Sequence, residues 1–223
     1  HHMEVDSAYV IAEFKNQTDS ILVIKDTLVK FPLHIFSLKE GYLKKNDKIQ
    51  LECSSPILLL DISKINLMSD SIPINFEIDY DDFFLELDFQ KEEDKTYQLK
   101  LEKGALYGLN NCISDSCEFM YYTKGESSLS KIEINLTTDI QNYFLEIIKE
   151  GVVIERLSQD ETLIFNELLP DNYEIRLTKD DNKDGKWNPG NYHENLFPEK
   201  VYYYIEHLKL RANWDLEIDW EIP

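Results

Sequence analysis

Apolar and polar residues alternate strictly along the last part of the chain. From Leu208 to Ile222 every even-numbered position is apolar and every odd-numbered position is polar or charged. A period of two places all the apolar side chains on one face of a β-strand, whereas a helix would scatter them around its circumference. At about 3.3 Å per residue this segment would reach roughly 50 Å, much longer than an ordinary strand. We therefore predict a strand that bends or bulges near Asn213, or a ribbon that leaves its own module.

Strand-like segments also occur throughout the rest of the chain. Segments rich in Ile, Val, Leu, Tyr and Phe, bounded by Asp, Asn, Ser, Gly or Pro, occur at 8–14, 21–29, 48–53, 72–78, 83–89, 97–101 and 118–122. Short strands between regularly spaced turn signals are typical of β-sandwiches. Helix is expected only as a single turn over 61–65. The pattern predicts an all-β protein built from tandem β-sandwich modules.

The polar stretch 123–128 separates an aromatic strand from a new alternating segment. Such a stretch is typical of a domain boundary, so we predict one domain over 41–125 and a second over 129–223. A weaker break near Gly41 leaves residues 4–40 outside this division. They are expected to form either part of an upstream β module or strands added to the 41–125 domain.

The charge of the chain narrows its function. Lys and Arg number 23 against 43 for Asp and Glu, which gives a formal net charge of −20 over 223 residues. A phosphate backbone would be repelled by this charge, so nucleic-acid binding is not expected. No run of 18 apolar residues occurs, and the seven glycines form no phosphate-binding cluster. We interpret the acidity as a solvated surface, with attraction of a divalent cation or a basic partner as the alternative.

Residues suited to catalysis are scattered. His34, His193 and His207 lie far apart and match no metal-ligand spacing. Adjacent acids such as Asp81 and Asp82 arise by chance in so acidic a chain and are typical of solvated turns. We therefore predict that the protein is not an enzyme and has no catalytic residues.

Three cysteines are present. Cys112 and Cys117 flank a short loop, so an oxidising compartment would allow a disulfide bond between them, closing a ring too small to add much stability. Cys53 alternates within a strand-like segment and is expected to be a small buried apolar residue.

Two parts of the chain carry a family resemblance. The first resembles the bacterial Ig-like domain first described in S-layer proteins, through segments 48–57, 61–67, 93–99 and 103–108. The second resembles the carboxy-terminal end of Ig-like envelope lipoproteins of Bacteroidota, through segments 168–173, 180–192, 198–204 and 211–215. Many of those relatives carry Gly after Pro170, where this chain has Asp171; Asp also tolerates turn conformations.

The resemblance implies a fold and a role. It implies an Ig-like domain followed by a transthyretin-like or Ig-like sandwich, in an exported and lipid-anchored protein without catalytic activity. The expected function is a scaffold or protein-interaction module of an outer-membrane assembly, with other envelope proteins as partners; the alternative is a glycan-binding module of a surface lipoprotein. Membrane contact is expected only through a lipid anchor, which residues 1–3, interpreted as a tag remnant, would have replaced.

The acidic loop allows two interpretations. Asp180, Asn182 and Asp184 precede Gly185 with the spacing of a calcium-binding loop, to which Lys186 would add a carbonyl and Asn188 a side-chain oxygen. The carboxylate expected at the twelfth position of such a loop is missing, because that residue is Asn191. The favoured alternative needs no ion: the Asp and Asn side chains bond to their own backbone, and Trp187 packs as a lid.

Aromatic residues follow the same loop. Trp187, Tyr192 and Tyr203 would offer a platform for a sugar or a peptide. Alternation sends Tyr203 to the opposite face from its two neighbours, so part of this group is expected to pack in the core. Apart from calcium, no cofactor is expected.

Overall fold

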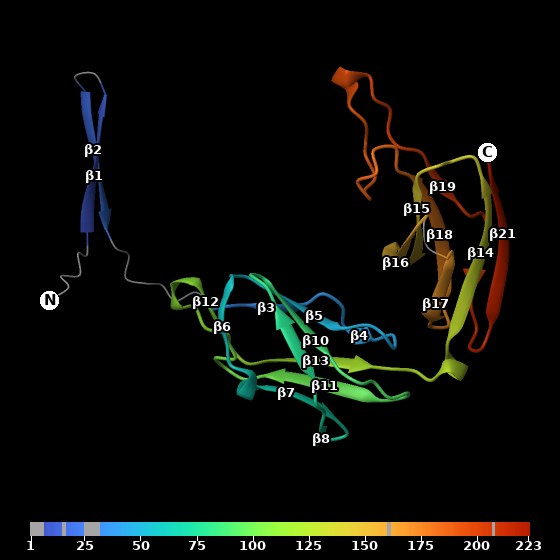
Figure 1. Ribbon diagram of the computed structural model, residues 1–223, viewed down its shortest axis with the longest axis horizontal. Helices are drawn as coiled ribbons and strands as arrows, with labels where there is room; N and C mark the ends of the chain where they lie inside the picture. The colour runs from blue at the N-terminus through green and yellow to red at the C-terminus, as the bar shows by residue number, and fades with distance from the viewer. Residues whose placement is uncertain (1–6, 15–16, 25–31, 160–161, 207) are drawn as a thin grey trace. The chain divides into compact units, whose positions relative to one another are not determined.

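The computed structural model describes residues 7–14, 17–24, 32–159, 162–206 and 208–223 (Figure 1). Within them, regular structure consists of β-strands and short 3-10 turns. The chain divides into two compact units, residues 1–122 and 123–223, and each has its own hydrophobic core. The predicted all-β class with tandem sandwich modules is therefore confirmed.

The first described residues form a hairpin. Strand β1 (Ser7–Phe14) pairs antiparallel with β2 (Gln17–Ile24), with Ser7 opposite Ile24. Residues 25–29 of the expected strand 21–29 lie outside the described residues. Further on, β3 (Ile35–Ser37) pairs with a strand of the first sandwich. The end of the 4–40 segment thus supplies an added strand of that sandwich.

Two sheets face each other in the first sandwich. One sheet has the order β3, β5 (Ile49–Cys53), β10 (Phe84–Asp88) and β9 (Glu77–Tyr80). The other has the order β4 (Gly41–Tyr42), β13 (Cys117–Tyr122), β11 (Thr96–Leu101), β7 (Ile65–Ser69) and β8 (Ile72–Pro73). Strands β6 (Ile57–Leu60) and β12 (Leu106–Gly108) pair separately.

Alternation decides which side chains fill this core. On β5, Ile49, Leu51 and Cys53 are buried, whereas Gln50 and Glu52 point outward. The segment 72–78, expected as one strand, is two: β8 belongs to one sheet and β9 to the other, because the chain crosses between sheets there. The expected helical turn is present as η1 (Ile62–Lys64), capped by the Asp61 side chain.

In the second sandwich, the first strand pairs with the last strand. Its smaller sheet has the order β17 (Ile164–Leu168), β14 (Ser130–Thr138) and β21 (Asp215–Ile222), with β21 parallel to β14. Its larger sheet has the order β16 (Val152–Ser158), β15 (Tyr143–Lys149), β18 (Asn172–Lys179) and β19 (Val201–Tyr203), and β20 (Leu208–Lys209) also pairs with β18.

The predicted bend in the closing segment is confirmed. Strand β20 ends at Lys209, and β21 begins at Asp215. Between them Asn213 adopts a left-handed backbone with φ of 55°, a conformation that Asn tolerates better than most residues. The Asn213 amide donates to the carbonyl of Leu129 at 2.8 Å, which holds the bend against the start of the unit.

The turn before β18 is held by a buried tyrosine. The Tyr173 hydroxyl donates to the Leu169 carbonyl four residues upstream, at 2.8 Å. A tyrosine bonded to the backbone shortly before it is a recurring device at corners of β-sandwiches.

We expect Tyr173→Phe to lower the free energy of unfolding by about 0.5–1.5 kcal/mol, because the ring stays packed while one hydrogen bond is lost. Urea unfolding of both proteins measures this difference. Tyr192→Phe, at a tyrosine of the same unit that is 92% exposed, serves as the comparison. Equal stability of Tyr173→Phe and the wild type would show that water replaces the lost bond.

Candidate functional site

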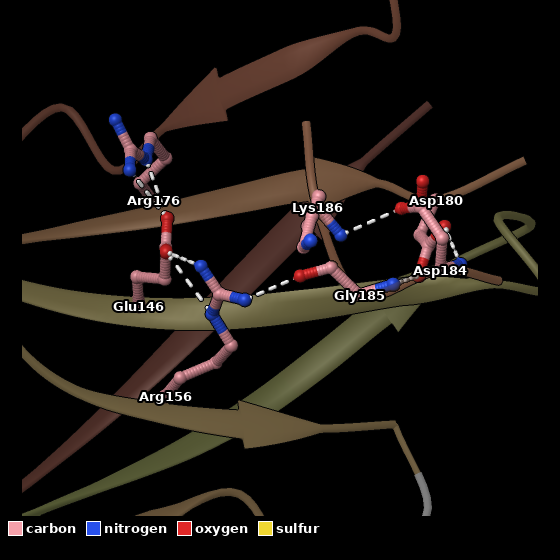
Figure 2. Close-up of polar contacts among 7 residues, drawn as sticks. All are labelled: Glu146, Arg156, Arg176, Asp180, Asp184, Gly185 and Lys186. Atoms are coloured by element: carbon pink, nitrogen blue, oxygen red, sulfur yellow. Dashed lines mark hydrogen bonds and ion pairs between the residues drawn. The ribbon is translucent and has the colours of Figure 1, made fainter. Parts of the chain in front are cut away.

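A row of charged side chains crosses the outer face of the larger sheet in the second sandwich. Glu146 on β15 lies opposite Arg156 on β16 and opposite Arg176 on β18. The Arg156 Nη2 atom is 2.5 Å from Glu146 Oε1, and Arg176 Nε is 2.7 Å from Oε2 (Figure 2). The Glu146 side chain is only 1% exposed. Two arginines therefore compensate one buried carboxylate.

The arginines connect this row to its surroundings. Burial alone would lower the pKa of Arg176, but hydrogen bonds with Tyr203 and Glu146 raise it, so the guanidinium stays charged. Arg156 lies over the ring of Phe144, with 4.2 Å from its guanidinium carbon to the ring centroid. Arg156 also donates to the carbonyl of Gly185, as Figure 2 shows. The charged row thereby holds the acidic loop against the sheet.

The acidic loop bonds to its own backbone. The Asp180 carboxylate accepts from the amides of Asp184 at 3.1 Å and Gly185 at 2.9 Å. The Asp184 carboxylate accepts from the Lys186 amide at 2.8 Å and from the Asn182 side chain at 2.9 Å. These bonds are those of the turn interpretation.

Glu199 forms hydrogen bonds that hold together the two ends of the segment 187–198, which follows the acidic loop. Glu199 is buried, and its two carboxylate oxygens accept from the amides of Asp181 at 2.8 Å and Asn188 at 2.9 Å. The indole N–H of Trp187 donates to the Glu199 carbonyl at 2.9 Å. Glu199 therefore connects the end of this segment to its beginning and to the acidic loop.

The segment closed by Glu199 exposes large apolar side chains; we call residues 187–198 the aromatic arm. It extends beyond the strand ends between β18 and β19 (Figure 1). Tyr192 is 92% exposed and Phe197 is 90% exposed, with Leu196 also exposed between them. Gly190 has φ of +79°, and a Cβ there would meet the Leu196 carbonyl at 2.5 Å, so only glycine fits. A fixed base thus presents an apolar tip to solvent.

The structure divides the predicted aromatic platform. Trp187 and Tyr192 belong to the aromatic arm, whereas Tyr203 lies on β19, where it bonds with Arg176. Sequence reasoning missed Leu196, Glu199 and Glu146. The pair of apolar residues Leu196 and Phe197 just before a proline, inside a polar loop, was the available signal for the tip.

The predicted calcium ligands lie between Asp180 and Asn188, in the acidic loop and at the start of the aromatic arm. Asn188 donates from its side chain to Asp184 at 3.2 Å and to the Lys186 carbonyl at 3.3 Å. In the part of the chain that the structure describes, no three His, Cys, Asp or Glu side chains gather as a metal site. Calcium binding by Asp180, Asn182, Asp184, Lys186 and Asn188 stays a prediction.

The cysteines are free thiols in this structure, so the Cys112–Cys117 disulfide is not formed. Cys112 is buried where its sulfur lies against Gly108, whereas Cys117 begins β13 opposite Leu101. Burial raises the pKa of the Cys117 thiol to about 11 and of the Cys53 thiol to about 12. Both thiols are therefore protonated and unreactive at neutral pH. Cys53 is buried, as expected.

The acidic loop should weaken in acid. Hydrogen bonds from the side chains of Asn188 and Asn182 and from the Lys186 amide lower the pKa of Asp184 below its ordinary value of 3.8. A lowered pKa contributes stability that is present above 3.8 and is lost as the pH falls through the folded-state value.

We therefore expect Asp184→Asn to be less stable than the wild type at about pH 7 and to approach it at about pH 3. Chemical unfolding at the two pH values measures both differences. Asp181→Asn is the control, because its carboxylate bonds to Lys179 outside this turn. If the difference in stability between Asp184→Asn and the wild type is the same at both pH values, the lowered pKa of Asp184 is contradicted.

Among the described residues, the structure has no helix with the length and apolar character needed to cross a membrane.

Comparisons with known proteins give distant structural similarity only. No protein-family model and no curated protein matches the chain. The Bacillus anthracis TIE protein aligns at a TM-score of 0.25 and 9% identity, over 85% of this chain and 40% of that one. Fibronectin(III)-like modules of Clostridium thermocellum CbhA align at 0.21 and 8% identity, over 81% and 95%.

A third similar structure is SGBP-B of the Bacteroides ovatus mixed-linkage glucan utilization locus, in complex with a mixed-linkage heptasaccharide. It aligns at a TM-score of 0.25 and 11% identity, over 91% of this chain and 49% of that one. The chain thus spans less than half the length of this protein and of the TIE protein. At such scores the alignments assign no function.

Proposed function

We propose that this protein is a non-enzymatic interaction module of the cell envelope, and that the aromatic arm is its contact with a partner protein. The main observation in support is the exposure of Tyr192, Leu196 and Phe197 on a segment whose base is fixed by hydrogen bonds. Large apolar side chains held in water by a fixed loop are typical of protein contact sites. Because the base is already ordered, the arm loses little conformational freedom when it binds.

The polar groups at this site support a structural role. Asp180, Asp184 and Glu199 each accept hydrogen bonds from backbone amides, and Glu146 is enclosed by two arginines. These carboxylates position the arm. Binding through apolar side chains is therefore favoured over acid–base chemistry at this place.

The envelope location and the lipid anchor are part of the proposal through the resemblance of segments 168–173 and 180–192 to envelope lipoproteins. In that setting the anchor would hold the chain at the outer membrane and the arm would reach a neighbouring protein. Fractionation of cells expressing the full-length protein tests the location: recovery in the soluble cytoplasmic fraction would contradict it.

Glycan binding is the second candidate. The indole of Trp187 is half exposed on the arm, and Tyr192 lies on the same segment. Aromatic faces pack against the apolar faces of sugar rings, and Tyr and Trp combine such a face with a polar group. A glycan array in which a signal disappears in Trp187→Ala would favour this candidate over protein contact.

The arm is tested by capture of partners from solubilised native envelope. We expect the wild type to retain a defined protein and Tyr192→Ser/Phe197→Ser to lose it, because the substitutions remove the apolar tip. Ile205→Ser is the matched control, since Ile205 is 94% exposed in the same unit but outside the arm. Retention of the same protein by the double variant, or loss by the control alone, would reject the proposal.

Calcium binding by the acidic loop is tested separately. If Asp180, Asn182 and Asp184 bind the ion, added calcium raises the melting temperature of the wild type and leaves that of Asp184→Ala unchanged. Magnesium at the same concentration is the control for ionic strength. If added calcium does not change the melting temperature of the wild type, the interpretation of the loop as a turn without an ion is correct.

A further inference from the structure

The outer face of the four-stranded sheet in the first sandwich carries exposed aromatic side chains. Phe36 on β3 lies opposite Glu52 on β5, and Glu52 lies opposite Phe84 on β10. Phe36 is 55% exposed and Phe84 is 41% exposed. Leu51 and Cys53 beside Glu52 are buried, so Glu52 points away from the core, and its cross-strand partners Phe36 and Phe84 lie on the same side of the sheet. One carboxylate is therefore flanked by two aromatic residues.

A second row crosses the same face two residues before Glu52 on β5. Gln50 lies opposite Glu86, and Glu86 lies opposite Asp79 on β9. A groove of about 450 Å³ follows this row, with Leu38, Tyr80 and Phe84 as its apolar lining and Gln50, Asp79 and Glu86 as its polar lining. We call the two rows together the acidic aromatic face.

The charges of this face identify what fits it. Its strands contribute the carboxylates of Glu52, Glu77, Asp79, Glu86 and Asp88. A lysine just before β5 already contacts the face: Lys48 Nζ lies 3.2 Å from Glu86 Oε2. Hydrogen bonds from Gln50 and Lys48 lower the pKa of Glu86, so this carboxylate is ionised at neutral pH. The face therefore attracts cations and repels anions.

We propose that the acidic aromatic face binds an extended, arginine-bearing segment of a partner protein. A guanidinium stacks on aromatic rings and pairs with a carboxylate in a fixed geometry, and the row of Phe36, Glu52 and Phe84 offers both contacts. The two rows lie about 7 Å apart, which is also the spacing of every second side chain in an extended chain. A segment with basic residues at alternate positions therefore places one cation on each row.

This inference is independent of the aromatic arm. The face belongs to the first unit and the arm to the second. If one of the two proposals is rejected, the other is not affected. A neutral glycan would also stack on Phe36 and Phe84, but it gains nothing from the surrounding carboxylates. Charge complementarity therefore favours the basic segment.

The test uses a fluorescent peptide of alternating Arg and Ser and the full chain, with anisotropy measured at low and at moderate ionic strength. We expect saturable binding that weakens with salt. Phe36→Thr and Phe84→Thr should each raise the Kd by about two- to five-fold, and Glu52→Gln by a similar factor. Threonine keeps a high strand propensity and glutamine keeps the shape of the side chain, so folding is preserved. A peptide of alternating Lys and Ser should bind less tightly.

Two controls separate the face from the charge of the whole chain. Met120→Thr changes an exposed residue on β13 in the other sheet of the same unit, and Glu217→Gln removes one exposed carboxylate from β21. Neither should change the Kd. The proposal is overturned if Glu217→Gln weakens binding as much as Glu52→Gln, if both phenylalanine variants bind like the wild type, or if only neutral oligosaccharides bind.

Discussion

Arg176→Met lowers the free energy of unfolding of the second sandwich by about 3 kcal/mol. Glu146 loses one of its two cationic partners while its own side chain stays 1% exposed. The remaining partner, Arg156, reaches only one carboxylate oxygen and is the more exposed of the two arginines. Removing one member of a buried ion pair leaves a charge without compensation, which costs far more than the loss of a surface pair.

Urea unfolding followed by circular dichroism measures this loss. Arg211→Met is the matched control, because Arg211 is exposed and lies over Trp214 at the surface; we expect it to change stability by less than about 0.5 kcal/mol. Replacing Glu146, Arg156 and Arg176 together by Leu and Met should restore most of the stability, since no buried charge then remains. Wild-type stability of Arg176→Met would mean that water reaches Glu146.

Glu199→Ala is the second change with a large expected effect. The carboxylate closes the base of the aromatic arm by accepting from the amides of Asp181 and Asn188. Its removal leaves two part-buried backbone donors without their acceptor, so we expect a loss of about 1–3 kcal/mol. The same change should free the arm, because its two ends are no longer joined.

Limited proteolysis and partner capture measure whether the arm has been freed. Cleavage within residues 187–198 should become faster, and capture should weaken although Tyr192 and Phe197 are unchanged. Glu194→Ala is the control: Glu194 is an exposed acid within the arm itself. Unchanged cleavage in Glu199→Ala would show that other contacts fix the base of the arm, and equal effects of both substitutions would indicate a general effect of charge.

Much of the fold was predictable because the signal is local. The alternation on β21 and the bend near Asn213 could be predicted from neighbouring residues, and the structure confirms both. The segment 72–78 was wrongly predicted as one strand, because alternation does not reveal when a chain leaves one sheet for the other. Likewise the end of 4–40 became β3 through pairing with β5, a contact between distant residues.

The candidate sites were less predictable for the same reason. Asp180, Asp184 and Trp187 were identifiable, since they form a motif in consecutive residues. Glu146 could not be distinguished from the other acids, because its role depends on register across three strands. The row of Phe36, Glu52 and Phe84 likewise exists only once β3, β5 and β10 are side by side.

The pairing of β14 with β21 has a mechanical consequence. These strands run parallel from Lys131 opposite Asp215 to Thr138 opposite Ile222. Tension applied at the start of β14 and the end of β21 would pull the two strands past each other lengthwise. All their inter-strand bonds would then carry load at once, instead of opening one after another. The second unit is therefore built to withstand stretching between its own two ends.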